Sequence, residues 1–293
     1  MNRKKRLTSI FRWIAIILGC LIVGLYILFP VGMGIAAIVP GKETVNSTPV
    51  GFEPVELTTE DGINLYGWYA PPTNGAAIVL LHGAGGSREQ LRPYADMLAQ
   101  HGYGVLTLDL RGHGMSAGPT NRLGWLSTPD VKAAVDYLQA QEGVEQIGGL
   151  GLSMGGEVLL GAVSEVPALR AVVADGATRR STQELLALPS ERPLVRNFTA
   201  RVMFAAVQLL GGGRPPKPLL ESMLEAETAS FLFIAGGAEQ MEVAFNERFA
   251  ESLGARAEVW IAPEAAHTGA FSRYPDEYEQ RVVEFFDRVL LGE

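Results

Sequence analysis

The sequence predicts an α/β protein, with a mostly parallel sheet covered by helices on both faces and a membrane-spanning helix in front of it. Short β-like runs alternate with helical stretches from residue 55 to residue 290. A repeated strand-then-helix order is typical of a parallel sheet, because each crossover places a helix on one of its faces. In addition, residues 13–41 contain no charged side chain. These observations predict a globular α/β domain behind an apolar N-terminal segment.

The apolar N-terminal segment predicts a membrane anchor. About 20 apolar residues cross a bilayer, and residues 13–29 are the firmest span, with a kinked continuation to residue 39. Five basic residues lie within the first twelve positions, which places the N-terminus in the cytoplasm and the rest of the chain outside. We therefore expect a basic tail and anchor over 1–41 and a linker over 42–54. A cleaved signal peptide, cut near residues 34–37, is the alternative.

Composition limits the class of protein further. The chain has 293 residues, a mean hydropathy of +0.15 and a formal net charge of −8. Five of the 24 basic residues and no acidic residue lie in the first twelve positions, so the remainder has 19 basic against 32 acidic residues, a net charge of −13. This acidic balance argues against nucleic acid as a partner. Cys20 is the single cysteine and lies within the apolar segment, so an intrachain disulfide is excluded.

The predicted elements follow the apolar runs. Two runs around the turn at 60–62 predict an antiparallel hairpin, and the fully apolar run at 76–81 predicts a strand buried on both faces. The expected strands cover residues 55–59, 65–69, 76–81, 105–108, 147–152, 171–174, 231–235 and 257–261. The expected helices cover residues 89–100, 128–141, 157–164, 243–253 and 277–290.

One segment interrupts this alternation. Residues 176–230 contain no clear strand, and residues 198–210 are typical of an amphipathic or largely apolar helix. An insertion after a sheet strand occupies the place of a lid over a pocket. We expect a lid insertion within a domain that spans 55–293, with ordinary surface helices as the alternative.

The pentapeptide G-L-S-M-G at 151–155 is the most informative motif. It follows an apolar β-like run and precedes a helical stretch, which is the strand–turn–helix context of a nucleophile elbow. The sharp turn lifts the Ser153 hydroxyl clear of the sheet, and the glycines let other backbone pass close by. Ser153 is therefore the predicted nucleophile.

A serine hydroxyl needs a base to take its proton. Of the four histidines, His267 alone follows Ser153 in the chain, in a loop after the last expected strand. With the elbow motif, the order along the chain is serine, acid, histidine. His267 is therefore the predicted base.

Three carboxylates are candidates for the acid that orients His267. Glu239 follows the strand expected at 231–235 and is the preferred choice. Asp175, after the neighbouring strand, and Glu242, three residues beyond Glu239, are the alternatives.

The oxyanion of the tetrahedral intermediate needs backbone donors. We expect the N–H groups of Met154 and Ala84, the latter in the loop after the first parallel strand, with Gly83 or Gly85 as one-residue alternatives for Ala84. His82 is interpreted as a structural residue that holds this loop. The polar segment 109–116 is expected to brace the loops at the carboxyl edge of the sheet.

Metal and nucleotide motifs are missing from the sequence. It has no paired ligand set with metal spacing, no G-x-G-x-x-G and no G-x-x-x-x-G-K-[ST] motif. The predicted triad needs no cofactor, so we expect neither a metal nor a cofactor.

Together, the motifs at 82–86, 109–116, 151–156 and the His267 loop resemble the α/β-hydrolase superfamily, in family order and over residues 55–291. The resemblance implies an eight-stranded, mostly parallel sheet and hydrolysis of esters, thioesters or amides. The anchor and the C-terminal segment are similar to the Bem46-like serine hydrolases. Many relatives have aspartate where Glu239 stands.

The predicted function is therefore that of a membrane-anchored serine hydrolase that cleaves a carboxylic ester or thioester, in the manner of a carboxylesterase or lipase. Its partners would be the membrane and a small acyl substrate, with a lipid-like chain favoured by the anchor and the apolar insertion. A peptidase or acyltransferase with the same triad is one alternative. A membrane-tethered scaffold that has lost catalysis is the other.

Overall fold

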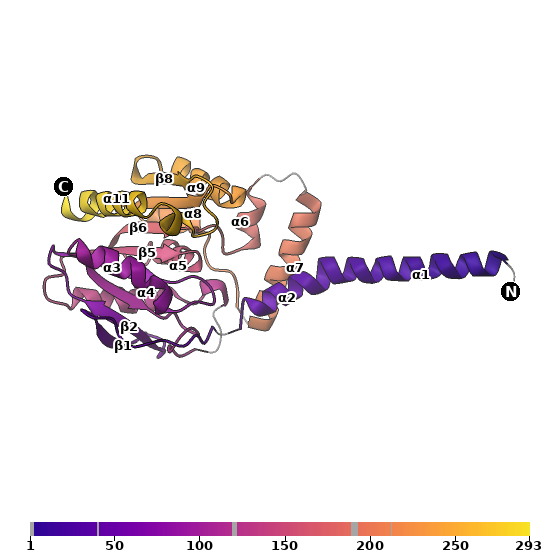
Figure 1. Cartoon of the computed structure of the whole chain (residues 1–293), viewed down its shortest axis with the longest axis horizontal. Helices are drawn as coiled ribbons and strands as arrows, with labels where there is room; N and C mark the ends of the chain where they lie inside the picture. The colour runs from indigo at the N-terminus through magenta and orange to yellow at the C-terminus, as the bar shows by residue number, and fades with distance from the viewer. Residues whose placement is uncertain (1–2, 40, 119–121, 189–192, 212) are drawn as a thin grey trace.

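The computed structural model of the chain describes residues 3–39, 41–118, 122–188, 193–211 and 213–293 (Figure 1). Within these residues eight strands form one sheet. All eight expected strands are present, with ends that differ by no more than two residues. Their bounds are β1 (Glu53–Thr58), β2 (Asn64–Ala70), β3 (Ala76–Leu81), β4 (Gly104–Leu108), β5 (Gln146–Leu152), β6 (Leu169–Asp175), β7 (Ser230–Gly236) and β8 (Ala257–Ala262).

The strand order is β1-β2-β4-β3-β5-β6-β7-β8. The pairs β1–β2 and β2–β4 are antiparallel, which confirms the predicted hairpin, and all other neighbouring pairs are parallel. Because β3 to β8 run in one direction, the loops that follow them gather at one edge of the sheet.

Helices cover both faces and create two hydrophobic cores (Figure 1). The helices are α3 (Arg92–Gln100), α4 (Thr128–Gln139), α5 (Met154–Ala162), α9 (Gln240–Leu253), α10 (Ala270–Arg273) and α11 (Pro275–Phe286). Along β3, Val79 and Leu81 belong to the core under α4, α5 and α9, whereas Ile78 and Leu80 belong to the core under α3 and α11. This alternation follows from the two-residue period of a strand and explains why β3 is apolar throughout.

The N-terminal segment is one long helix that projects from the body (Figure 1). It comprises α1 (Arg3–Val23), the π-helical turn η1 (Gly24–Leu28) and α2 (Phe29–Ala36). Pro30 lies in the first turn of α2, directly after the π-helical turn, which is where the continuous helix departs from regular α geometry. Among the described residues, Ser9–Ala36 is the one helix long and apolar enough to span a membrane.

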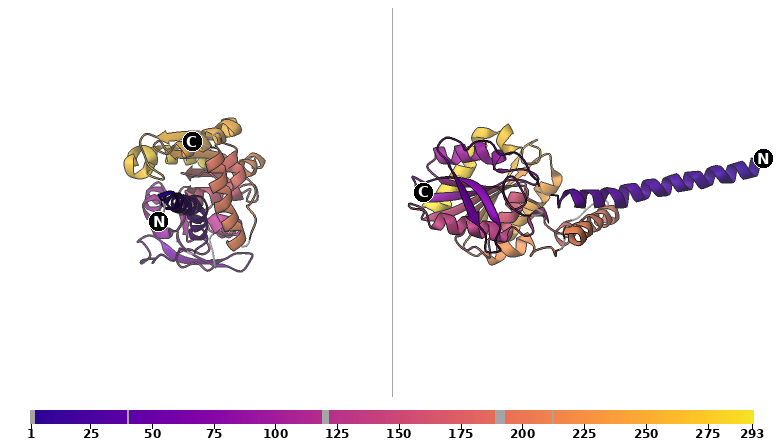
Figure 2. Two further views of the ribbon diagram at one scale, coloured as in Figure 1. Left: turned by 90° about the vertical axis from the view of Figure 1, so that its right-hand side faces the viewer. Right: turned by 90° about the horizontal axis from the view of Figure 1, so that it is seen from below.

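The segment between β6 and β7 is helical, as expected. It contains α6 (Thr182–Leu186), α7 (Pro193–Gly211) and α8 (Leu219–Glu225), and its described residues include no strand. In Figure 2, α7 lies beside the base of the N-terminal helix. A Cβ atom at Gly34 would come within 2.7 Å of the Met203 carbonyl oxygen, so α2 and α7 touch at their backbones.

Candidate active site

Ser153 lies at the sharp turn between β5 and α5. Its backbone has φ 50° and ψ −115°, a conformation that is strained for any residue with a side chain. The glycines on either side permit the turn, because a Cβ at Gly151 would come within 2.3 Å of Gly155 and one at Gly155 within 2.2 Å of the Leu81 carbonyl oxygen. The sequence therefore forms the predicted elbow.

His267 lies in the loop after β8, and its ring reaches across the sheet edge to Ser153. The distance from His267 Nε2 to Ser153 Oγ is 2.9 Å, which is that of a hydrogen bond. Thr268, next in the chain, has φ 50°, so the loop is bent sharply beside the ring. The His267 side chain is about half exposed, so an incoming molecule can reach the pair from solvent.

Glu242 contacts the other ring nitrogen of His267. Its Oε1 pairs with Nδ1, and its Oε2 accepts a hydrogen bond from the Gly236 N–H at 3.0 Å. The carboxylate raises the pKa of His267 above its ordinary value, through this hydrogen bond and against the opposing effect of burial. An acid so placed fixes the tautomer in which Nδ1 carries the proton and Nε2 faces the serine.

The structure therefore corrects the preferred acid. Glu239, which we expected to contact His267, is exposed and precedes the first turn of α9. Glu242 is buried because it lies on the stripe of α9 that faces the sheet, one turn from Phe245 and Asn246. That spacing of three and four residues was the signal in the sequence that favoured Glu242.

Asp175, the remaining candidate acid, is fully buried at the end of β6. Its neighbour Gly176 lies against the ring, since a Cβ there would come within 3.0 Å of His267 Cε1. Within the described part of the chain, neither Asp175 oxygen has a hydrogen-bond partner at normal distance. Burial raises the pKa of Asp175 to about 7. The neighbouring Tyr278 hydroxyl opposes this shift, and the charge of Glu242 adds to it. Asp175 is therefore near the Ser153–His267 pair but does not contact His267 as an orienting acid.

Two backbone N–H groups, one in the loop after β3 and one after Ser153, are the expected donors to the oxyanion. Gly83 donates to Gln90 Oε1 at 3.0 Å, and Gly85 donates to His113 Nε2 at 3.3 Å. The N–H groups of Ala84 and Met154 have no partner among the described residues. Of the three candidates in this loop, the N–H of Ala84 is therefore the one that can donate to a substrate. The catalytic role of the Ala84 and Met154 N–H groups stays a prediction.

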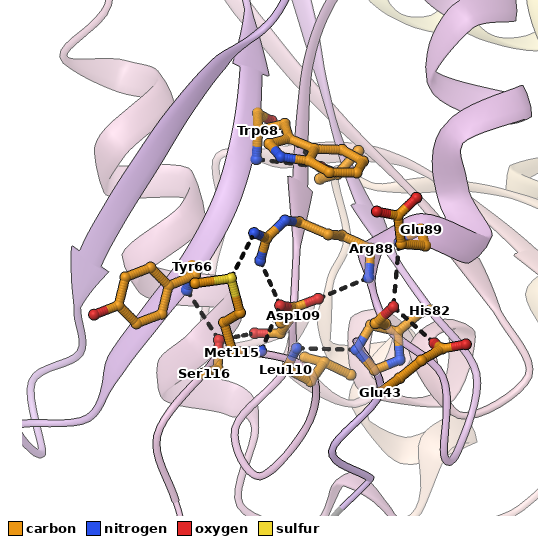
Figure 3. A network of polar contacts seen from close by, with 12 residues as sticks. Glu43, Tyr66, Trp68, His82, Arg88, Glu89, Asp109, Leu110, Met115 and Ser116 are labelled. Atoms are coloured by element: carbon orange, nitrogen blue, oxygen red, sulfur yellow. Dashed lines mark hydrogen bonds and ion pairs between the residues drawn. The ribbon is translucent and has the colours of Figure 1, made fainter. Parts of the chain in front are cut away.

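His82 and the segment after β4 hold the loop that carries Ala84 (Figure 3). The Leu110 N–H donates to His82 Nε2 at 3.1 Å, so Nδ1 carries the ring proton and donates to the Gly83 carbonyl at 2.8 Å. Burial lowers the pKa of His82 to about 3, with a smaller contribution from His113. The ring is therefore neutral and acts as a structural connection, as expected.

The Asp109 carboxylate is the centre of the same network (Figure 3). It accepts from the Arg88 N–H at 2.7 Å and from the Met115 N–H at 2.9 Å, and it forms an ion pair with the Arg88 guanidinium. Arg111 is held in the same way by Asp61 and Asp130. These contacts confirm that the polar segment after β4 braces the sheet edge.

The segment that follows the N-terminal helix is hydrogen-bonded to the loops after β3 and β4. The Gly41 carbonyl accepts from the Gly114 N–H at 2.8 Å, and Ser87 Oγ donates to Glu43 Oε2 at 2.7 Å. A Cβ at Gly41 would come within 3.0 Å of Gly85 Cα. The chain that leaves the N-terminal helix therefore passes directly over the loop of Ala84 before it enters β1.

Metal ligands do not gather at this site. Across the residues that the structure describes, no group of three or more His, Cys, Asp or Glu side chains is arranged to hold a metal ion. The chemistry available from these side chains is proton transfer and nucleophilic attack.

Comparison with known proteins gives independent evidence on the family of this chain. The family model described as "Serine aminopeptidase, S33" matches residues 72–208. Among solved structures, the esterase Pf2001 of Pyrococcus furiosus is 26% identical, with a TM-score of 0.69, over 87% of this chain and 98% of its own. The chain belongs to the α/β-hydrolase superfamily. The Bem46-like subgroup stays a prediction.

Curated relatives of this hydrolase include the YfhR proteins of enteric bacteria. The protein YfhR of Salmonella typhi is 32% identical over 155 residues, which cover 50% of the hydrolase and 52% of YfhR. The hydrolase thus spans about half the length of that relative. YfhR of Escherichia coli K12 is 25% identical over 84% of both chains.

Proposed function

We propose that this protein is a membrane-anchored serine hydrolase that cleaves a carboxylic ester or thioester. The observation that carries the proposal is the 2.9 Å contact between Ser153 Oγ and His267 Nε2, with Glu242 on the opposite ring nitrogen. Nucleophile, base and orienting acid thus stand in the order that acyl transfer requires.

The proposed reaction proceeds in two halves. His267 Nε2 takes the Ser153 proton as Oγ bonds to the acyl carbonyl carbon, and the N–H groups of Ala84 and Met154 bind the oxyanion. The bond to the leaving oxygen or sulfur then breaks, and His267 gives its proton to the alcohol or thiol. Water next attacks the acyl-enzyme with its proton passing to His267, the carboxylic acid leaves, and Ser153 regains its hydrogen.

The anchor sets the proposed location. Ser9–Ala36 crosses the membrane, the basic residues before it stay in the cytoplasm, and the hydrolase domain lies outside. The helices between β6 and β7 act as a lid beside the site. From Trp13 to Ala36 this helix has no charged residue, and many of its large apolar side chains are exposed. This supports the arrangement, because such a surface is stable in lipid and costly in water.

Substitution of Ser153 tests the mechanism. We expect Ser153→Ala to lower kcat on p-nitrophenyl butyrate by several orders of magnitude, up to about 10⁶-fold. The wild-type protein should also react with a fluorophosphonate probe at Ser153, whereas Ser153→Ala should not. Full activity in Ser153→Ala refutes the mechanism, and an intact wild type that neither labels nor hydrolyses the ester is the tethered scaffold instead.

A peptidase with the same triad is the second candidate, favoured by the description of the matching family model. An amide differs from an ester in its leaving group, which must receive the His267 proton before it departs. Parallel assays on aminoacyl p-nitroanilides and p-nitrophenyl esters separate the two. A kcat/KM that is higher on the anilides identifies a peptidase.

A further inference from the structure

A cavity of about 360 Å³ lies between the N-terminal helix and α7. Phe29 and Met33 line it from the anchor, and Val195 and Met203 line it from α7. Most of its other walls are also apolar. The volume falls within the range of pockets that bind small ligands.

The two helices that line this cavity, α2 and α7, contact each other directly at one end of it. A Cβ at Gly34 would come within 2.8 Å of Ala206 Cβ, so glycine permits the close approach of α2 to α7. The helices diverge from that point, and the cavity occupies the space between them. The anchor is therefore part of the cavity wall as well as a tether.

Two residues of the cavity lining are connected to residues of the proposed triad. Met241 lines it and is followed in the chain by Glu242, which contacts His267. Arg179 also lines it, and its N–H donates to Glu157 Oε1 at 3.0 Å. Glu157 in turn donates its N–H to the Ser153 carbonyl at 3.0 Å. The cavity wall thus includes a chain neighbour of Glu242 and a hydrogen-bond partner of Glu157, the residues that contact His267 and Ser153.

The outer end of the cavity faces the surface that the anchor would carry into lipid. Leu25 and Phe29 are each more than half exposed, although both are large and apolar. On α7, large apolar side chains are exposed as well, at Leu194, Phe198 and Leu209. Exposed apolar surface on both walls marks this side of the protein as the one in contact with the membrane.

We propose that this cavity binds the acyl chain of a membrane-resident ester, so that the substrate enters from the bilayer between the anchor and α7. The inference rests on the proposed function, since it places the scissile ester at Ser153. Ester and water give a carboxylic acid and an alcohol, and the acyl chain stays beside α2 and α7 during the reaction. Each methylene that moves from water into the cavity should favour binding about fourfold.

The test uses the full chain in phosphatidylcholine vesicles, with p-nitrophenyl butyrate and p-nitrophenyl laurate as substrates. Val195→Trp and Met33→Trp fill the cavity from opposite walls. Leu210→Trp and Ile35→Trp place the same side chain on the same helices outside the cavity lining. We expect the first two to lower kcat/KM on laurate at least tenfold with butyrate changed less than twofold, and the controls to change neither.

Labelling of Ser153 by a fluorophosphonate in each variant reports that the fold and the triad are intact. If the cavity variants label normally but match their controls on laurate, or lose both esters equally, the acyl-chain proposal is overturned while the serine hydrolase stands. If the wild type neither labels nor cleaves butyrate, the proposed function fails, and the acyl-chain proposal fails with it.

Discussion

Glu242 uses both carboxylate oxygens, one for His267 and one for the Gly236 N–H. Glu242→Gln keeps the size of the side chain but removes the charge that stabilises the imidazolium. We expect kcat/KM on p-nitrophenyl butyrate to fall about 10²- to 10⁴-fold. Glu239→Gln is the matched control, because Glu239 is exposed, and it should leave kcat/KM unchanged. Equal losses in the two variants would restore Glu239 as a candidate acid.

The same pair of variants should differ in pH dependence. Glu242 raises the pKa of His267, and the base must be unprotonated to accept the Ser153 proton. In Glu242→Gln the pKa of His267 falls, so the acidic limb of kcat/KM moves to lower pH. Glu239→Gln should keep the wild-type limb.

Asp175 should affect stability more than turnover. Folding raises its pKa from 3.8 to about 7, so the unfolded chain releases this proton at lower pH than the native protein does. The free energy of unfolding therefore loses a contribution as pH rises from about 4 to 7. Asp175→Asn has no carboxyl proton at this position, so its free energy of unfolding lacks this pH dependence. The free energy of unfolding of Asp175→Asn minus that of wild type should therefore rise by at most about 3 kcal/mol between pH 5 and pH 7.

Urea unfolding of the full chain in detergent at pH 5, 6, 7 and 8 measures this difference for Asp175→Asn. The difference should level off above pH 7, and kcat/KM should stay within about tenfold of wild type. A stability difference that does not vary with pH contradicts the shift. A loss of kcat/KM as large as that in Glu242→Gln contradicts the assignment of Glu242.

At the scale of elements, the elbow between β5 and α5 depends on backbone clearance. Gly155→Ala would place a Cβ within 2.2 Å of the Leu81 carbonyl oxygen, and backbone cannot yield as a side chain can. Gly32→Ala is the control, because no atom lies within 4 Å of a Cβ there and α2 is helical. We expect thermal unfolding of Gly155→Ala at least about 3 °C below wild type and no loss in Gly32→Ala. An unchanged melting temperature in Gly155→Ala would show that the elbow can open.

The elements that the sequence predicts well are those that a local pattern determines. β3 is found at the residues expected, since a run that is apolar on both faces fits only a strand in the middle of the sheet with helices on both sides. The choice between Glu239 and Glu242 depended on where α9 begins, and the ends of helices are weakly determined by sequence. The contact of Gly41 with the loop of Ala84 joins segments far apart in the chain, so no local pattern predicts it.

At the scale of the whole molecule, the membrane orientation can be measured with cysteine labels. Cys20 is the single cysteine, so Cys20→Ala gives a thiol-free background. Val50→Cys adds a thiol at a linker position that is 99% exposed, and Thr8→Cys adds one before the span. A membrane-impermeant maleimide should label Val50→Cys in intact cells and Thr8→Cys only after permeabilisation. The reverse pattern contradicts the orientation, and a soluble product contradicts the anchor.

The contacts of Gly41 and Glu43 with the loops around Ala84 leave little slack between the lipid surface and Ser153. An enzyme on a long, loose tether samples many heights, whereas this one would work at a nearly constant height above the head groups. Such an arrangement sorts substrates by how far their reactive bond projects from the bilayer. Two lipids with identical acyl chains would then be cleaved at different rates if their ester bonds lie at different depths.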